Sequence, residues 1–435
     1  MLEELNLRIQ SANLLESYGK VEEFVGLSVK AKVRDAFYGE VCTISSSRGH
    51  SLDAEVKGFR DGKVVLLPYG DLTGLTPGCF VRRTHSVLQV PVSDAMLGRV
   101  LDGMARPIDS GQPVSKGSSR PLRAGSLSPM DRGRINTVLE TGVKAVDSML
   151  TIGEGQRIGV FAGAGVGKSS LLGMLTSGVD ADITVIALIG ERGREVKDFL
   201  EEVITPEQRQ RTVIIAATAD EPAVMRVNAA FTAMAICEFF RDQGKRVFLA
   251  MDSLTRLAMA QREVGLAVGE PPTARGYTPS VFALLPELVE RAGKKEGAGS
   301  ITGVYTLLVE NEEAEDPVAE CARAILDGHI VLNRSIANEG RYPAIDYLSS
   351  ISRLAGKLQS PREQQLCRKS RSLIKAYIEG KELIGLGAYQ EGQNAEVDQA
   401  LDQVPKLYAL FRQDGSADMD RAGVYLQMAK IMGEA

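Results

Sequence analysis

Between residues 20 and 90, short apolar or alternating runs are broken by turn residues, as in KVEEFVGLSVKAKV, GEVCTI and DGKVVLLPY. Asp61-Gly62 stands between two such runs, and this dipeptide is a strong signal for a two-residue hairpin. Many short strands joined by tight turns are typical of a small closed sheet. We therefore predict a β-barrel of about six strands over residues 21–90, preceded by an N-terminal helix over residues 1–20.

The stretch from Arg106 to Arg134 has a different composition, rich in Gly, Pro, Ser and Arg. Such residues favour turns and rarely build a packed interior. We expect this stretch to be a linker or surface excursion.

From residue 155 the rhythm changes again, to apolar strands separated by segments long enough for helices. The strand candidates read RIGVFAG, ITVIALIG, TVIIAAT, RVFLAMD, SITGVYTLLVE and HIVLN. Continuous Val, Ile and Leu runs are typical of strands buried on both faces. Residues 91–360 are therefore predicted to form a mainly parallel sheet with helices on both sides, an α/β domain.

After Pro361 the strand candidates stop and helical periodicity takes over, with one break near YIEGKELIGLGAYQEG. Residues 361–435 are therefore predicted to form a small C-terminal helical domain.

Composition excludes several classes of protein. The 435 residues include 51 Lys and Arg against 56 Asp and Glu, a net charge of −5, with no Trp and 5% aromatic residues. This balance provides neither a basic field nor stacking platforms for nucleic acid, so we expect no nucleic-acid partner. Five widely spaced cysteines indicate reduced thiols. The chain also lacks a secretory leader and an apolar stretch of ~18 residues, and we expect it in the cytoplasm.

The first candidate site is a glycine-rich turn that directly follows an apolar strand, in RIGVFAGAGVGKSS. Small residues let backbone N–H groups turn inward around a phosphate, and the following helix points its positive end at the same anion. Lys168 would reach the β- and γ-phosphates of ATP, and Ser169 would ligate Mg²⁺. The alternative is a turn that binds nothing. The candidate phosphate-binding residues are Ala162, which replaces the usual first glycine, Gly163, Ala164, Gly165, Val166, Gly167, Lys168, Ser169 and Ser170.

Two further carboxylates end strands of the same predicted sheet. Asp252 ends RVFLAMD, where it can hold a Mg²⁺-bound water. Glu191, in GERGREV, can polarise the water that attacks the γ-phosphorus, although a surface carboxylate is the alternative. Arg192 beside it is a candidate for a phosphate contact or for a structural salt bridge.

Beyond these motifs, long stretches resemble the ATPases of type III protein export, flagellar or virulence-associated. They include LIGERGREVKDFL, GEPPTARGYTPSVFALLPELVERAG, ILDGHIVLNR and YPAIDYLSSISR, and LGRVLDGMARPID at the end of the first domain. That family is itself similar to the catalytic subunits of rotary ATP synthases. The resemblance covers nearly the whole chain and implies a central RecA-like P-loop domain, with an N-terminal barrel and a C-terminal helical domain.

The resemblance also assigns roles to residues. It implies that Glu191 is the catalytic carboxylate, that Arg192 and Arg256 are phosphate-side arginines, and that Lys168, Ser169 and Asp252 serve phosphate and Mg²⁺. Tyr342, in RYPAID, matches an aromatic residue that packs on adenine; an ordinary core tyrosine is the alternative. Arg353, in SISRL, matches an arginine finger that reaches the neighbouring subunit's site; a plain interface arginine is the alternative.

The implied function is ATP hydrolysis by a homohexameric ring that energises or prepares protein export. The implied partners are a stator-like regulator, a central stalk protein, an export gate, export substrates and chaperones. The implied location is the cytoplasm, peripheral at the inner face of the bacterial cytoplasmic membrane. Two other readings remain at this point, a rotary ATP synthase-type subunit and an RNA-translocating hexameric ATPase; the sequence does not separate the flagellar from the virulence branch.

Overall fold

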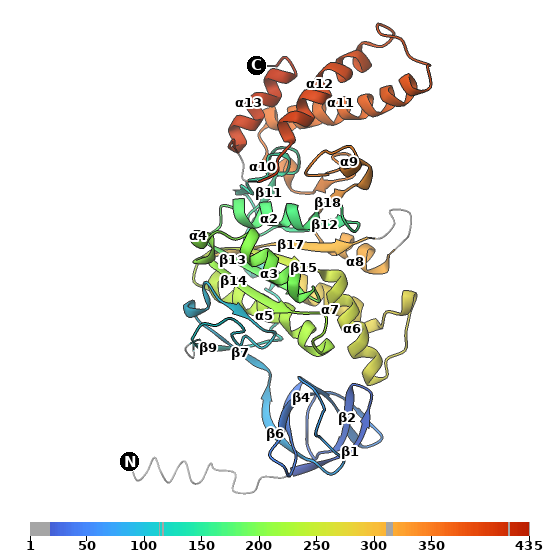
Figure 1. The fold of residues 1–435 in the computed structure, drawn as a ribbon. Helices are drawn as coiled ribbons and strands as arrows, with labels where there is room; N and C mark the ends of the chain where they lie inside the picture. The colour runs from blue at the N-terminus through green and yellow to red at the C-terminus, as the bar shows by residue number, and fades with distance from the viewer. Residues whose placement is uncertain (1–17, 113, 115–116, 310–315, 416–417, 435) are drawn as a thin grey trace.

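The computed structural model describes residues 18–112, 114, 117–309, 316–415 and 418–434. A barrel stands at one end, a layered α/β domain in the middle and a group of helices at the other end (Figure 1). The expected N-terminal helix over residues 1–20 lies outside the described residues except for its last three. Those three are extended, contrary to the prediction, because they pair with two neighbouring strands of the barrel.

Within the described residues, six strands close the barrel in the order β1-β2-β5-β4-β3-β6. Asp61 and Gly62 join β4 to β5 with φ angles of 52° and 73°, and two positive φ values define the predicted hairpin turn. Closure leaves no unpaired strand edge. The strands are β1 Tyr18–Val25, β2 Ser28–Lys32, β3 Glu40–Ser45, β4 Ser51–Arg60, β5 Lys63–Pro68 and β6 Phe80–Val87.

The stretch between the barrel and the central domain is more structured than its composition suggests. The strands β7 (Gln89–Val92) and β9 (Ser118–Pro121) pair, and the side chain of Leu122 is only 2% exposed. The Leu122 N–H donates to Leu88 O, and its carbonyl accepts from the buried Arg291 side chain. The expectation of a surface linker from Arg106 to Arg134 is therefore wrong around Leu122, which belongs to the core.

The described residues of the central domain form a nine-stranded sheet in the order β19-β18-β12-β17-β15-β13-β14-β8, with β16 paired to β17. All pairs are parallel except those made by β16 and β19. The fold class and all six predicted strands are confirmed. The strands are β8 Val100–Leu101, β12 Arg157–Ala162, β13 Ile183–Ile189, β14 Thr212–Ala217, β15 Arg246–Asp252, β16 Gly293–Lys294, β17 Ser300–Leu308, β18 Gly328–Leu332 and β19 Ile351–Ser352.

Helices follow most of these strands and cover both faces of the sheet. They are α2 Lys168–Gly178, α3 Gly193–Glu202, α4 Pro206–Arg209, α5 Ala223–Asp242, α6 Leu254–Val268, α7 Pro279–Val289, α8 Pro317–Ile325, α9 Arg334–Asn338 and α10 Ala355–Leu358. Short elements complete the domain: β10 Val138–Leu139, β11 Ile152–Gly153, and the single turns η1 Asp94–Met96, η2 Pro129–Asp131, η3 Val146–Leu150 and η4 Ala274–Gly276. Because parallel strands share a direction, their carboxyl ends meet at one edge of the sheet, where ligands of such domains bind.

Helix α5 corrects the expectation that the chain has no apolar stretch of ~18 residues. Among the described residues it is the one helix whose length and mean hydropathy, 1.4, would suffice to cross a membrane. Of the residues in its most apolar 18-residue stretch, 94% are buried inside the protein. The apolar length of α5 thus matches its position in the core.

Three helices form the C-terminal part: α11 Pro361–Gly385, α12 Ala395–Phe411 and α13 Arg421–Ile431. Helix α11 starts where predicted, because Ser360 and Glu363 form a capping box and Pro361 occupies the first turn. After α12, Gln413 donates its backbone N–H to Tyr342 O and its side-chain amide to Gly142 O. These bonds connect the helical part to the edge of the sheet that carries the candidate site.

Candidate nucleotide-binding site

The glycine-rich loop spans residues 163–167, between the end of β12 and the start of α2. Gly165 and Gly167 have φ angles of 75° and 92°, which side chains with a Cβ rarely adopt, whereas Gly163 does not need this conformation. No acidic residue lies in the first turn of α2, so its N-terminal amides and positive dipole end suit an anion. This backbone geometry suits a phosphate, and phosphate binding by the loop stays a prediction.

Three predicted residues from three different segments meet beside this loop. The Lys168 ammonium donates to Asp252 Oδ1 and lies 3.9 Å from Glu191 Oε1. Asp252 ends β15 and is 5% exposed, and Thr306 Oγ1 on the adjacent β17 donates to the same oxygen, Oδ1, at 2.6 Å. Adjacent strands β13, β15 and β17 bring these groups together at the carboxyl edge of the sheet.

The surroundings of Glu191 tune its acidity toward neutral pH. Burial and, after it, the nearby Asp252 carboxylate together raise the pKa of Glu191 to about 7, although Lys168 and Arg256 oppose the shift. A carboxyl group with a pKa near the working pH combines a substantial deprotonated fraction with real basicity. A surface carboxylate would not show this shift.

This pKa leads to a pH prediction. Because only the deprotonated Glu191 can accept a proton from water, kcat/KM for ATP is expected to fall about tenfold per unit as the pH drops below about 7. Phosphate release at low ATP concentration, measured between about pH 5.5 and 8.5, provides the profile. A flat profile across neutral pH would contradict the assignment.

A cavity of 250 Å³ opens between the first turn of α2 and helix α3. Its walls include Ser169, Ser170, Glu191 and Asp252 together with apolar side chains of α3. Among the residues that the structure describes, no three His, Cys, Asp or Glu side chains are grouped to hold a metal ion by themselves. Mg²⁺ commonly uses one or two protein oxygens plus phosphates and waters, so the Ser169 hydroxyl and the second oxygen of Asp252 fit a Mg²⁺ that arrives with ATP.

Tyr342 lies beside the glycine-rich loop, next to Gly167. Its ring would be 3.5 Å from a Cβ atom at Gly167, and its side chain is 39% exposed. Tyr342 lines a 240 Å³ cavity together with Tyr408, Phe411 and Arg412 from the C-terminal helices. A half-exposed aromatic ring beside a phosphate loop can stack on a base, and a core tyrosine would be buried.

The three predicted arginines are placed differently. Arg256 lies in the first turn of α6 and packs against Gly190, where an added Cβ atom would be 3.0 Å from the Cβ of Arg256. This position is beside Glu191. The side chain of Arg192 is 82% exposed and pairs with Glu195 at 3.8 Å. Arg353 is exposed and donates to the carbonyl of Arg323, and its backbone N–H donates to Asp327 O at the amino end of β18, the opposite end from the loop. Only Arg256 thus joins the site within the described residues of one chain.

Two residues that the sequence did not single out belong to the site. Thr306 holds Asp252, and Arg334 at the start of α9 donates to Ala164 O of the loop at 3.0 Å. Thr306 is one of several β-branched residues in a strand and carries no signal in the sequence. Arg334 follows HIVLN directly, at the carboxyl end of β18 beside β12, and its position in a parallel sheet is the signal that could have found it.

The fold and the site together define a P-loop ATPase with a RecA-like domain, flanked by a barrel and a helical domain. The ATP synthase alpha/beta family matches with its nucleotide-binding domain over residues 142–352 and with its β-barrel domain over residues 21–85. The T3SS EscN ATPase C-terminal domain matches residues 359–430.

Relatives cover nearly the whole chain. The chain is 44% identical to the flagellum-specific ATP synthase of Bacillus subtilis over 93% of each chain. It is 46% identical to the type 3 secretion system ATPase of Xanthomonas euvesicatoria over 90% of this chain and 88% of the relative. The structure of the assembled ATPase EscN from the enteropathogenic Escherichia coli type III secretion system has a TM-score of 0.90 and 41% identity, covering 95% of this chain and all of EscN.

The chain belongs to the family of flagellar and type III secretion ATPases, a branch of the ATP synthase alpha/beta family. It is therefore an ATPase. The C-terminal match and the relatives favour this branch over the rotary synthase subunit and the RNA translocase that the sequence left open.

Proposed function

We propose that the chain works as a homohexameric ring that hydrolyses Mg²⁺-bound ATP in the cytoplasm to energise or prepare protein export. The observation that carries this proposal is the contact of Lys168 with Asp252 beside a Glu191 whose pKa is about 7, at the N-terminus of α2. These residues supply an anion cradle and a water-activating base in one place.

In the proposed mechanism, separate groups bind the phosphates and activate the attacking water. The loop amides and Lys168 hold the β- and γ-phosphates, and Arg256 adds positive charge beside Glu191. Glu191 orients a water molecule and accepts its proton as the water attacks phosphorus. Mg²⁺ would neutralise charge on the phosphates, held by Ser169 and by water on Asp252.

In a ring, an arginine of one chain could complete the site of its neighbour. Arg353 is exposed and lies at the amino end of β18, whereas the loop of the same chain follows the carboxyl end of the parallel strand β12, and this position favours a role towards a neighbouring chain. EscN has been solved both assembled and in complex with its central stalk EscO, the latter with a TM-score of 0.87 to this chain. By analogy we propose a central stalk partner here. A stator-like regulator, an export gate, export substrates with their chaperones and a peripheral position at the membrane follow from the family resemblance alone.

The proposed function is tested by removing the Lys168 ammonium. Lys168→Ala is expected to weaken ATP binding and to lower Mg²⁺-dependent phosphate release about a hundredfold, because charge opposite the γ-phosphate is lost. In the source bacterium the same variant is expected to stop export, read as loss of motility or as loss of secreted virulence proteins, which also identifies the branch. Arg362→Ala, on the exposed first turn of α11, is the control. Export at the parent level by Lys168→Ala would overturn the proposal.

Tyr342 gives an independent prediction for the base. Tyr342→Ala is expected to raise KM for ATP about tenfold with little change in kcat, because stacking contributes ~1–3 kcal/mol to base binding. Tyr342→Phe keeps the ring and is the matched control, with KM expected within about twofold of the parent. Steady-state phosphate release against ATP concentration measures both. Equal KM values for the two variants would exclude a stacking role.

A further inference from the structure

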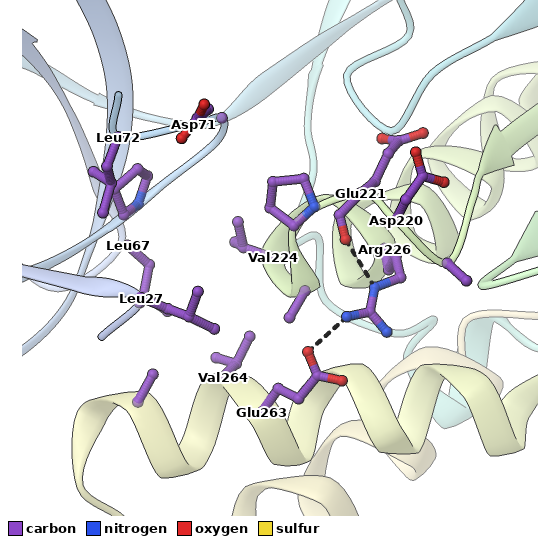
Figure 2. Close-up of a pocket in the computed structure, with 16 residues that line it drawn as sticks. Leu27, Leu67, Asp71, Leu72, Asp220, Glu221, Val224, Arg226, Glu263 and Val264 are labelled. Atoms are coloured by element: carbon purple, nitrogen blue, oxygen red, sulfur yellow. Dashed lines mark hydrogen bonds and ion pairs between the residues drawn. The ribbon is translucent and has the colours of Figure 1, made fainter. Parts of the chain in front are cut away.

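A larger cavity lies away from the nucleotide site, between the barrel and the central domain (Figure 2). Its volume is 630 Å³, within the range of small-molecule sites. Leu27, Leu67 and Leu72 line it from the barrel, and Val224 and Val264 line it from α5 and α6. These side chains form an aliphatic surface that an apolar group could cover.

The polar groups around this aliphatic surface are predominantly acidic. Asp71 lies on the barrel side, and Asp220 and Glu221 lie on the side of the central domain (Figure 2). Arg226 is already engaged, since it pairs with Glu263 at 2.6 Å and donates to Glu221 O at 3.1 Å.

The other three carboxylates are those of Asp71, Asp220 and Glu221. In the part of the chain that the structure describes, Asp71 accepts hydrogen bonds from Thr73, and Glu221 accepts one from the Thr218 N–H, but neither they nor Asp220 form an ion pair. Burial, with Asp102 and Asp220 nearby, raises the pKa of Glu221, although the Thr218 N–H and the more distant Arg106 oppose the shift. The cavity therefore combines an apolar surface with excess negative charge.

The wall of the cavity is hydrogen-bonded to the backbone of Glu191. Ala219, which lines the cavity, donates its N–H to Glu191 O at 3.2 Å. Helix α6 carries the half-buried Arg256 beside Glu191 near one end and the buried Val264 in the cavity about two turns further along. A change in the cavity can thus reach Glu191 by two short routes.

We propose that this cavity is an effector site for an amphipathic organic cation, and that its occupancy changes the rate of ATP hydrolysis through the Ala219–Glu191 contact. An aliphatic body would cover the leucine and valine side chains, and a cationic group would meet Asp71, Asp220 and Glu221. An anion of the same shape would be repelled. This inference goes beyond the proposed function, which assigns no ligand to this cavity.

Binding is tested on the full chain without nucleotide, by calorimetry with three probes below their micelle-forming concentrations. Octyltrimethylammonium is expected to bind at least about tenfold more tightly than octyl sulfate or octyl glucoside, because only it pairs with the carboxylates. Asp71→Asn combined with Asp220→Asn is expected to weaken its binding about tenfold. Glu382→Gln, an exposed acid on α11, is the control and should bind as the parent does. Equal binding of all three probes would overturn the proposal.

A second variant keeps the test decisive if the Asp71→Asn, Asp220→Asn variant fails to fold. Leu27→Lys, at an exposed turn of the barrel, places a cation of the chain itself at the cavity and is expected to abolish binding of octyltrimethylammonium while the melting temperature stays unchanged. Retained binding by this folded variant would place the probe elsewhere and overturn the proposal.

The effector role has its own readout. Octyltrimethylammonium is expected to change kcat for phosphate release at least about twofold in the parent and not in the Asp71→Asn, Asp220→Asn variant. Binding without any change in kcat would refute an effector role. Hydrolysis without the probe is measured first, so that a failure of the proposed ATPase mechanism is seen separately from a failure at this cavity.

Discussion

Replacing Glu191 by Gln is expected to lower kcat at least about a hundredfold while ATP still binds. The amide keeps the shape of the side chain but cannot accept a proton from the attacking water, and general base catalysis contributes ~10²–10⁴ in rate. Burial and the Asp252 carboxylate have shifted the pKa of Glu191 to about 7, which suits this role. Phosphate release measures turnover, and a fluorescent ATP analogue measures binding, so the two effects are separated.

The matched control for this variant is Glu201→Gln, on the exposed side of α3. Its side chain is 66% exposed and pairs with Lys197, one turn away on the surface, so its loss is expected to leave kcat within about twofold. If Glu191→Gln turned over ATP as fast as Glu201→Gln, Glu191 would have no part in the mechanism.

A mixture of two inactive chains is expected to recover activity. Arg353→Ala should bind ATP through its own loop yet lose at least about a thousandfold in rate, because an arginine finger contributes ~10³–10⁵ in other nucleotide hydrolases. Lys168→Ala should have a defective loop but an intact finger. In a mixed ring, some interfaces pair a good loop with a good finger, so phosphate release should pass through a maximum as the mixing ratio is varied.

The control is a second mixture, of Lys168→Ala with Glu191→Gln. The two residues lie 3.9 Å apart in one chain, so both substitutions damage the same half of the site and no interface is complete. This mixture should show no recovery. Light scattering establishes that both mixtures assemble to the same size. If the first mixture assembles and shows no more activity than the second, Arg353 is not a shared finger.

The sequence by itself determined the elements whose signal is local. Six of the strands in the central sheet are predicted from their continuous apolar runs. A parallel strand that is buried on both faces carries apolar side chains on each face, so apolar and polar residues do not alternate along it. The Asp61-Gly62 turn and the loop before Lys168 were equally clear, since positive φ values and inward amides require small residues at fixed spacing. The family resemblance then added Tyr342 and Arg353, which spacing alone would not have indicated.

Tertiary structure decided what depends on residues far apart in the chain. Thr306 holds Asp252, and Arg334 holds the loop at Ala164, across 54 and 170 residues of sequence. Leu122 is buried inside a stretch whose glycines and prolines predicted a surface, because packing against distant elements outweighs local composition. The neutral-range pKa of Glu191 likewise depends on burial and on the approach of Asp252, a strand away. Local patterns cannot contain these effects, since burial and charge proximity are created only when the strands pair.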